Sequence, residues 1–119
     1  MKLEPLYTMH VDLKAPVAVG PGPIGTRVVY DVAVGTFEGP RMRGTILPSG
    51  ADWLLVGGDG VSRLNVRAIA ATDDGAFIFL DYQGILAATP EAGAKIARGE
   101  VIDYGETYFM TAPRFETGV

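Results

Sequence analysis

Three side chains with acid–base chemistry stand out in this sequence: Glu38, Asp52 and His10, which is the single histidine. A histidine titrates near neutral pH, and a carboxylate close to an arginine on a neighbouring strand can move a proton. We therefore interpret these three as the candidate catalytic residues. The alternatives are a surface or wall position for His10 and a structural ion pair for the two carboxylates.

Arginine and aromatic side chains supply the candidate substrate-binding residues. An arginine can orient an anionic or carbonyl group, and an aromatic ring can pack against a flat ligand. The alternatives are structural ion pairs for the arginines, with Asp81 as a partner for Arg67, and core packing for the rings, which include Tyr82 and Tyr104. The candidates are Arg43, Trp53, Arg67, Tyr108 and Glu116.

We expect most of these side chains to meet at one cavity, in the mouth or interior of a barrel. A buried charge costs roughly several kcal/mol unless it is paired. Arginines in mid-strand with carboxylates on neighbouring strands are therefore most simply explained by pairing around a water-accessible hollow. The six expected to converge are Glu38, Arg43, Asp52, Trp53, Arg67 and Tyr108.

Cofactor and metal motifs are missing from the sequence. There is no cysteine and only one histidine, which excludes thiolate nucleophiles and histidine or cysteine metal clusters. An all-oxygen site from Glu38, Asp73 and Asp74 is conceivable, but no Asp-x-Asp-x-Asp-Gly loop accompanies it. Neither a nucleotide-binding glycine loop nor a serine nucleophile elbow is present. We predict no metal and no cofactor.

Composition narrows the class of protein. The 119 residues suit one domain over residues 1–119, and 48% hydrophobic residues suit a packed globule. The net charge of −4 and the lack of a basic run argue against nucleic-acid binding. No apolar run is long enough for a membrane span, and the first residues do not form a signal peptide. We therefore expect a soluble cytoplasmic protein.

The pattern of turns predicts an all-β fold. Sixteen glycines and eight prolines break the chain into short extended pieces. The stretch 35–53 is the richest in such breaks, and we interpret it as the corner that turns a sheet on itself. We expect a loop over 15–26 and one short helix over 89–98. The expected strands are 6–13, 27–34, 42–47, 52–56, 62–72, 76–86 and 104–112. The fold predicted is a single closed or nearly closed antiparallel β-barrel.

Several motifs resemble an uncharacterised bacterial and fungal family, domain of unknown function 3237. They begin with Leu-Glu-Pro-Leu-Tyr-Thr-Met-His-Val-Asp-Leu, Gly-Pro-Gly-Pro-Ile-Gly and Gly-Thr-Phe-Glu-Gly-Pro-Arg-Met-Arg-Gly. They continue with Gly-Ala-Asp-Trp, Thr-Asp-Asp-Gly-Ala and Tyr-Phe-Met-Thr-Ala-Pro-Arg-Phe-Glu-Thr-Gly, in order over nearly the whole chain. The resemblance implies a closed antiparallel barrel, calycin-like in outline. It implies no activity.

Three functions fit this reading. The first is a cofactor-free enzyme that moves a proton on a small, partly apolar organic molecule, as in isomerisation, cyclisation or hydration. The alternative is a calycin-like protein that binds such a ligand without turnover, and a third possibility is a structural or assembly module. Whether the protein is an enzyme stays open at this point.

The resemblance also leads to a prediction about assembly. Family members usually continue past Phe-Glu-Thr-Gly into further strand-forming sequence, whereas this sequence ends at Val119. Either the sequence is a shortened form or the barrel closes differently, for example through a partner chain. Because an unpaired edge strand is a template for pairing, we expect a homodimer. Light scattering should give a mass that rises with concentration towards twice that of the chain, and a monomer mass at every concentration would contradict the dimer.

Overall fold

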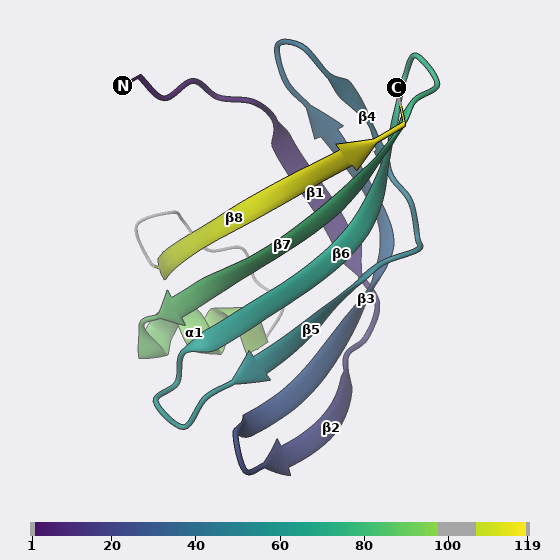
Figure 1. Ribbon diagram of the computed structural model, residues 1–119. Helices are drawn as coiled ribbons and strands as arrows, with labels where there is room; N and C mark the ends of the chain where they lie inside the picture. Colours follow the sequence, from purple (N-terminus) through teal and green to yellow (C-terminus); the bar gives the residue numbers. More distant parts are fainter. Residues whose placement is uncertain (1, 98–106, 119) are drawn as a thin grey trace.

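The computed structural model describes residues 2–97 and 107–118, which form eight strands and one helix (Figure 1). Every strand pair is antiparallel, and all eight strands belong to one hydrogen-bonded sheet. The elements are β1 (Thr8–Leu13), β2 (Val17–Gly22), β3 (Gly25–Glu38), β4 (Arg43–Ile46), β5 (Ala51–Val56), β6 (Ser62–Thr72), β7 (Phe77–Ala88), α1 (Pro90–Ala97) and β8 (Thr107–Thr117).

The long strands β3 and β6 organise the sheet. The strand order is β1-β3-β4-β6-β7-β8, while β5 also bridges β3 and β6, and β2 also pairs with β3. Thus β1 and β4 flank one end of β3, and β2 and β5 flank its other end. The pairing of β1 with β3 shifts its register between Asp12 and Leu13, and this shift marks the boundary between the two ends of β3. The barrel therefore has two halves that share β3 and β6.

The sheet curls into a nearly closed barrel. In Figure 1, β6, β7 and β8 form a front layer and β1 passes behind β8. Among the described residues, β1 and β8 form no backbone ladder. Side chains span the seam instead, because the ring of Tyr7, just before β1, meets both Phe37 and Phe115 edge to face at 6.2 Å between centroids. Such edge-to-face pairs favour close aromatic packing.

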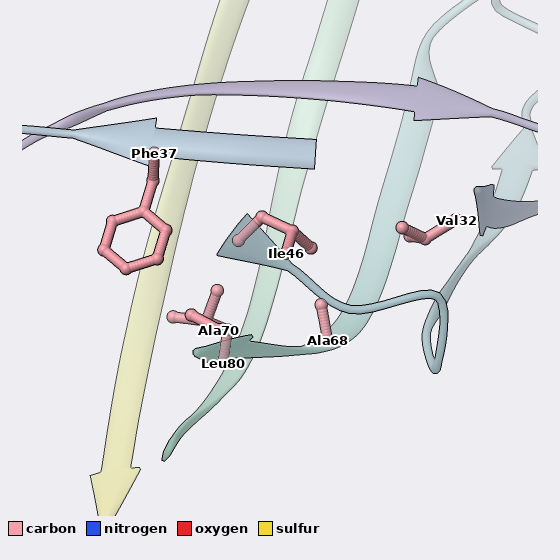
Figure 2. Packing of buried hydrophobic residues seen from close by; sticks show 6 residues of the cluster. All are labelled: Val32, Phe37, Ile46, Ala68, Ala70 and Leu80. Carbon is pink, nitrogen blue, oxygen red and sulfur yellow. The ribbon is translucent and has the colours of Figure 1, made fainter. Parts of the chain in front are cut away.

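The dry core occupies one half of the barrel. Its buried side chains come from β4, from the half of β3 that β1 and β4 flank, and from β6 and β7, and they point toward one another between the layers (Figure 2). Tyr7, Met9 and Val11 pack against this cluster, as the alternation along the first predicted strand implies. The cluster consists of Val32, Phe37, Ile46, Ala68, Ala70 and Leu80.

The glycine-rich stretch does form the corner. Gly44 lies on β4 where β4 crosses β6, and a Cβ atom there would collide with the backbone carbonyl of Ala71. At Gly35 a Cβ would come within 2.7 Å of the carbonyl oxygen of His10. In each of these two strand pairs, β4 with β6 and β3 with β1, the backbones can approach this closely only because the glycine carries no side chain.

Three predicted boundaries were wrong. The predicted strand 27–34 is longer, since β3 runs from Gly25 to Glu38. The segment 15–26 is not a loop throughout, since β2 lies within it and pairs with β3. Its prolines do not exclude pairing because β2 is an edge strand, where a missing N–H is tolerated. The last strand runs on to Thr117 rather than ending at residue 112, because it follows β7 in register to Ile78. Residues 98 and 104–106 of the predicted helix and strand lie outside the described residues.

The dry core gives the first test of this architecture. Phe37 is 3% exposed, whereas Phe77 on the outer face of β7 is 61% exposed. Phe37→Ala should lower the free energy of unfolding by about 3 kcal/mol, because it opens a cavity and removes the ring that Tyr7 contacts. Urea denaturation measures the loss. The control, Phe77→Ala, should change stability by less than about 0.5 kcal/mol, and equal losses would contradict this placement of the core.

Candidate functional site

A row of side chains crosses the inner face of the sheet between its two halves. Register places Tyr30 opposite Asp52, Asp52 opposite Val66, and Val66 opposite Tyr82. Directly paired residues in an antiparallel sheet point to the same face. Because Val66 is buried, the whole row faces the interior. We call these four residues the inner row.

Asp52 carries the charge of the inner row. Its Oδ1 accepts a hydrogen bond from the backbone N–H of Asn65 at 3.1 Å. Partial burial raises the pKa of the Asp52 carboxyl above its ordinary value, and the Asn65 N–H acts in the opposite direction. Among the strand residues that the structure describes, Asp52 is the one carboxylate on the inner face, as the register of the strands implies.

Tyr82 is the neutral partner in the inner row. Burial, followed by the negative charge of Asp52 and a smaller influence of Tyr7, raises the pKa of Tyr82 to about 12. Burial also raises the pKa of Tyr7. Both phenols therefore keep their protons at neutral pH and can act as hydrogen-bond donors.

An apolar wall continues from the inner row into the half of the barrel that β2 and β5 flank. Val28 pairs with Leu54 on the inner face, and Leu64 and Leu86 lie on the same face of β6 and β7. All four are half-buried, in contrast to the fully buried cluster in the other half. A carboxylate with a raised pKa, a neutral phenol and a half-open apolar wall together suit proton transfer on a small apolar molecule.

The predicted convergence on one cavity was wrong. Asp52 and Trp53 are adjacent on β5, so the two-residue period of a strand turns them to opposite faces. Asp52 points inward, and Trp53 shares the outer face with Arg67. Convergence on one cavity requires Arg67 to lie on the inner face of β6, but the buried side chains of β6 lie on its other face.

Glu38, Arg43 and His10 lie together on the outer face of β1, β3 and β4. Arg43 Nη2 is 3.2 Å from Glu38 Oε1, and both side chains are largely exposed. His10 Nε2 lies 3.6 Å from Asp12 Oδ1, and the His10 side chain is 83% exposed. They line a shallow hollow of about 340 Å³ together with Thr36 and Asp73. Their catalytic and binding roles stay predictions.

The other candidate binding residues line the outer face of β5 to β8. The guanidinium of Arg67 stacks 4.6 Å from the centroid of the Trp53 ring. Asp81 does lie opposite Arg67 in the ladder, but its ion pair, at 2.9 Å, is with Arg114. Glu116 pairs in register with Phe79 on this face. The role of each residue in binding stays a prediction.

Trp53 and Tyr108 meet at a groove of about 590 Å³ on this outer face. Its polar lining includes Arg27, Arg63, Asn65 and Gln83. We call this hollow the outer groove. Trp53 also lines a second hollow, of about 460 Å³, together with Arg67.

Sequence reasoning found part of the inner row. Asp52 was a candidate, and Tyr82 was named as an aromatic lining residue, but Tyr30 was not singled out. Its relation to Asp52 depends on the pairing of β3 with β5, and register is set by turn geometry and the shape of the whole sheet. The alternation of Val28, Tyr30 and Val32 along β3 was the available signal.

Two kinds of feature are absent from the described part of the chain. No group of three or more histidine, aspartate or glutamate side chains there is placed to hold a metal ion. No helix within residues 2–97 and 107–118 has the length and apolar character needed to cross a membrane.

Fold and sequence together define the family. The structure is an antiparallel, β-barrel-like sheet whose strands form an incomplete ring. The chain belongs to the family described as "Protein of unknown function (DUF3237)", whose model matches residues 1–119. A UPF0311 protein of Rhodopseudomonas palustris is 33% identical over 118 residues, which cover 98% of this chain and 77% of that protein.

Solved structures agree with this assignment. A protein of unknown function from Rhodopseudomonas palustris matches with a TM-score of 0.87 and 29% identity, over 96% of this chain and 74% of that one. A β-barrel-like protein from Acinetobacter baumannii matches with a TM-score of 0.73 and 28% identity, over 100% of this chain and 81% of that one. These relatives support the fold and carry no assigned activity.

The position of Asp52 predicts how stability depends on pH. Its folded-state pKa is raised, so folding favours the protonated form, and stability falls as pH rises from the unfolded through the folded pKa. Asp52→Asn removes this charge. The unfolding free energy of the variant minus that of the parent chain should therefore increase from acidic to neutral pH, as measured by urea denaturation at several pH values.

The matched control is Asp31→Asn, the same chemical change on the exposed outer face of β3. The Asp52 effect is read as the difference between the two variants. If the unfolding free energy of Asp52→Asn minus that of Asp31→Asn instead decreases toward neutral pH, the surroundings of Asp52 stabilise its carboxylate rather than disfavour it.

Proposed function

We propose that this protein acts on a small, partly apolar organic molecule at the inner row, with Asp52 moving a proton. The observation that carries the proposal is a half-buried carboxylate with a raised pKa, in the same row as a neutral Tyr82 and separated from it by Val66, on a mostly apolar inner face. A base in such surroundings is stronger than an exposed aspartate, and the phenol can donate a hydrogen bond to oxygen that gains charge.

The reaction class follows from this pair of groups. Asp52 takes a proton from carbon or oxygen, Tyr82 stabilises the resulting oxyanion, and the proton returns at another atom. Isomerisation, cyclisation and hydration can be assembled from these steps without a cofactor. The half-buried wall of Val28, Leu54 and Leu64 fits the apolar part of the substrate.

The alternative function is binding without turnover, in the manner of a calycin-like protein. The same apolar wall and the same polar pair would then fix the orientation of a ligand. A structural module is the third candidate, and the fully buried cluster in the other half of the barrel is the feature that favours it.

Assembly and location belong to the same proposal. We infer a one-domain cytoplasmic protein that forms a homodimer. The support for the dimer is β8, which pairs only with β7 among the described strands and exposes Tyr108, Phe109 and Met110. An edge strand with exposed apolar side chains favours pairing with another chain.

The catalytic proposal is tested with 5-nitrobenzisoxazole, a flat, partly apolar probe. A base removes its C–H proton, the ring N–O bond breaks, and a coloured cyanophenolate forms, so that absorbance measures the rate. The rate should rise with pH through the pKa of Asp52. Asp52→Asn should lower it by about a hundredfold, within the usual contribution of a general base.

The control for this experiment is again Asp31→Asn, which lies outside the inner row and should keep the parent rate. No acceleration by the parent chain would contradict catalysis. Shifts of the Leu54 and Leu64 methyl resonances with the probe would then favour the binding protein, and unshifted resonances would favour the structural module.

A further inference from the structure

The outer groove has the size and lining of a small-molecule site. Its volume of about 590 Å³ lies within the usual range of such sites, roughly 300–1,000 Å³. Trp53 and Tyr108 supply aromatic surface, while Asn65 and Gln83, directly opposite each other on β6 and β7, supply amide groups. The lining is mostly apolar with a few polar groups, as is typical of ligand sites.

Two arginines contact Trp53 without a carboxylate partner. Arg27 Nη1 donates to the backbone carbonyl of Trp53 at 2.9 Å, and Arg67 lies over the indole ring. Within residues 2–97 and 107–118, no carboxylate oxygen comes within ion-pair distance of either guanidinium. Arg63, also in the groove, is 3.7 Å from Asp59.

In the groove itself, Arg27 and Arg63 place two guanidinium groups against the one carboxylate of Asp59, whereas the chain as a whole has a net charge of −4. Arg27 is half-buried, and its hydrogen bond to Trp53 leaves other guanidinium donors available. A guanidinium fork matches a carboxylate with two parallel hydrogen bonds, and such charge-assisted bonds are the strong ones. The groove therefore combines an anion-binding end with an aromatic wall.

We propose that the outer groove binds a small aromatic carboxylate. The carboxylate pairs with Arg27 and Arg63, and the ring packs against Trp53 and Tyr108. This site is separate from the inner row, because adjacent residues of β5, Asp52 and Trp53, face opposite sides of the sheet. The proposal does not depend on the catalytic role of Asp52.

Trp53 makes the test direct, because it is the single tryptophan of the chain. Its fluorescence is followed while benzoate is added, with benzamide as the neutral analogue and acetate as the analogue without a ring. We expect a saturable change with benzoate and at least about tenfold weaker binding of the other two, since each lacks either the charge or the ring.

Substitutions of the groove arginines test where the carboxylate of benzoate binds. Arg27→Gln and Arg63→Gln should each weaken benzoate binding by about tenfold, the loss expected for one charge-assisted contact. Arg63→Gln leaves the hydrogen bond between Arg27 and Trp53 intact, so that it keeps the test valid if Arg27→Gln fails to fold. Arg41→Gln, in the exposed connection between β3 and β4 and outside the groove lining, is the control and should bind benzoate as the parent chain does.

The outcomes that would overturn the proposal are definite. Benzamide binding as tightly as benzoate would show that charge plays no part. Unchanged benzoate affinity in Arg63→Gln and in a folded Arg27→Gln would show that the anion does not lie in this groove. Absence of any saturable change with benzoate in the parent chain would reject the site.

Discussion

The two-residue period of β5, fixed by its pairing with β3 and β6, is the constraint on which the chemistry of this protein depends. Because Asp52 pairs with Tyr30 and Val66, its carboxylate faces the interior, and Trp53 must then face outward. A slip of one residue in this register would exchange the two. It would place an indole in the barrel and a carboxylate beside Arg67.

The division of the barrel into two halves explains why the Asp52 carboxyl is only partly buried. In one half, Phe37, Ile46 and Leu80 fill the space between the layers, and Tyr7 spans the seam to Phe115. Close packing of this kind supplies stability but admits no ligand. In the other half the inner wall stays half-exposed. Asp52 lies at the boundary, where burial is sufficient to disfavour its charge and one backbone N–H compensates in part.

The sequence was most informative where the pattern is local. Alternation along the first strand put Met9 and Val11 on the core face and His10 on the other, and the structure confirms this. The glycine-rich corner was also predicted, because Gly44 permits an approach that a side chain would block.

Long-range pairing limited what could be predicted of the site. Which face of β6 is the inner one depends on the curvature of the whole sheet, and alternation alone allowed the Arg67 face. Charged residues also gave a misleading signal, because pairs such as Glu38 with Arg43 form on an exposed outer face and do not require an interior cavity. The edge position of β2 was similarly hidden behind its proline and glycine content.

The most direct test of this account is the titration of the Asp52 carboxyl in the intact chain. Carboxyl-labelled aspartate can be followed by NMR across acidic and neutral pH, and the resonance of Asp52 is assigned as the one missing from Asp52→Asn. If Asp52 faces the partly desolvated interior beside Tyr82, it titrates above the ordinary value for an aspartate. Titration at or below that value would mean that Asp52 is well solvated, which would contradict the central claim.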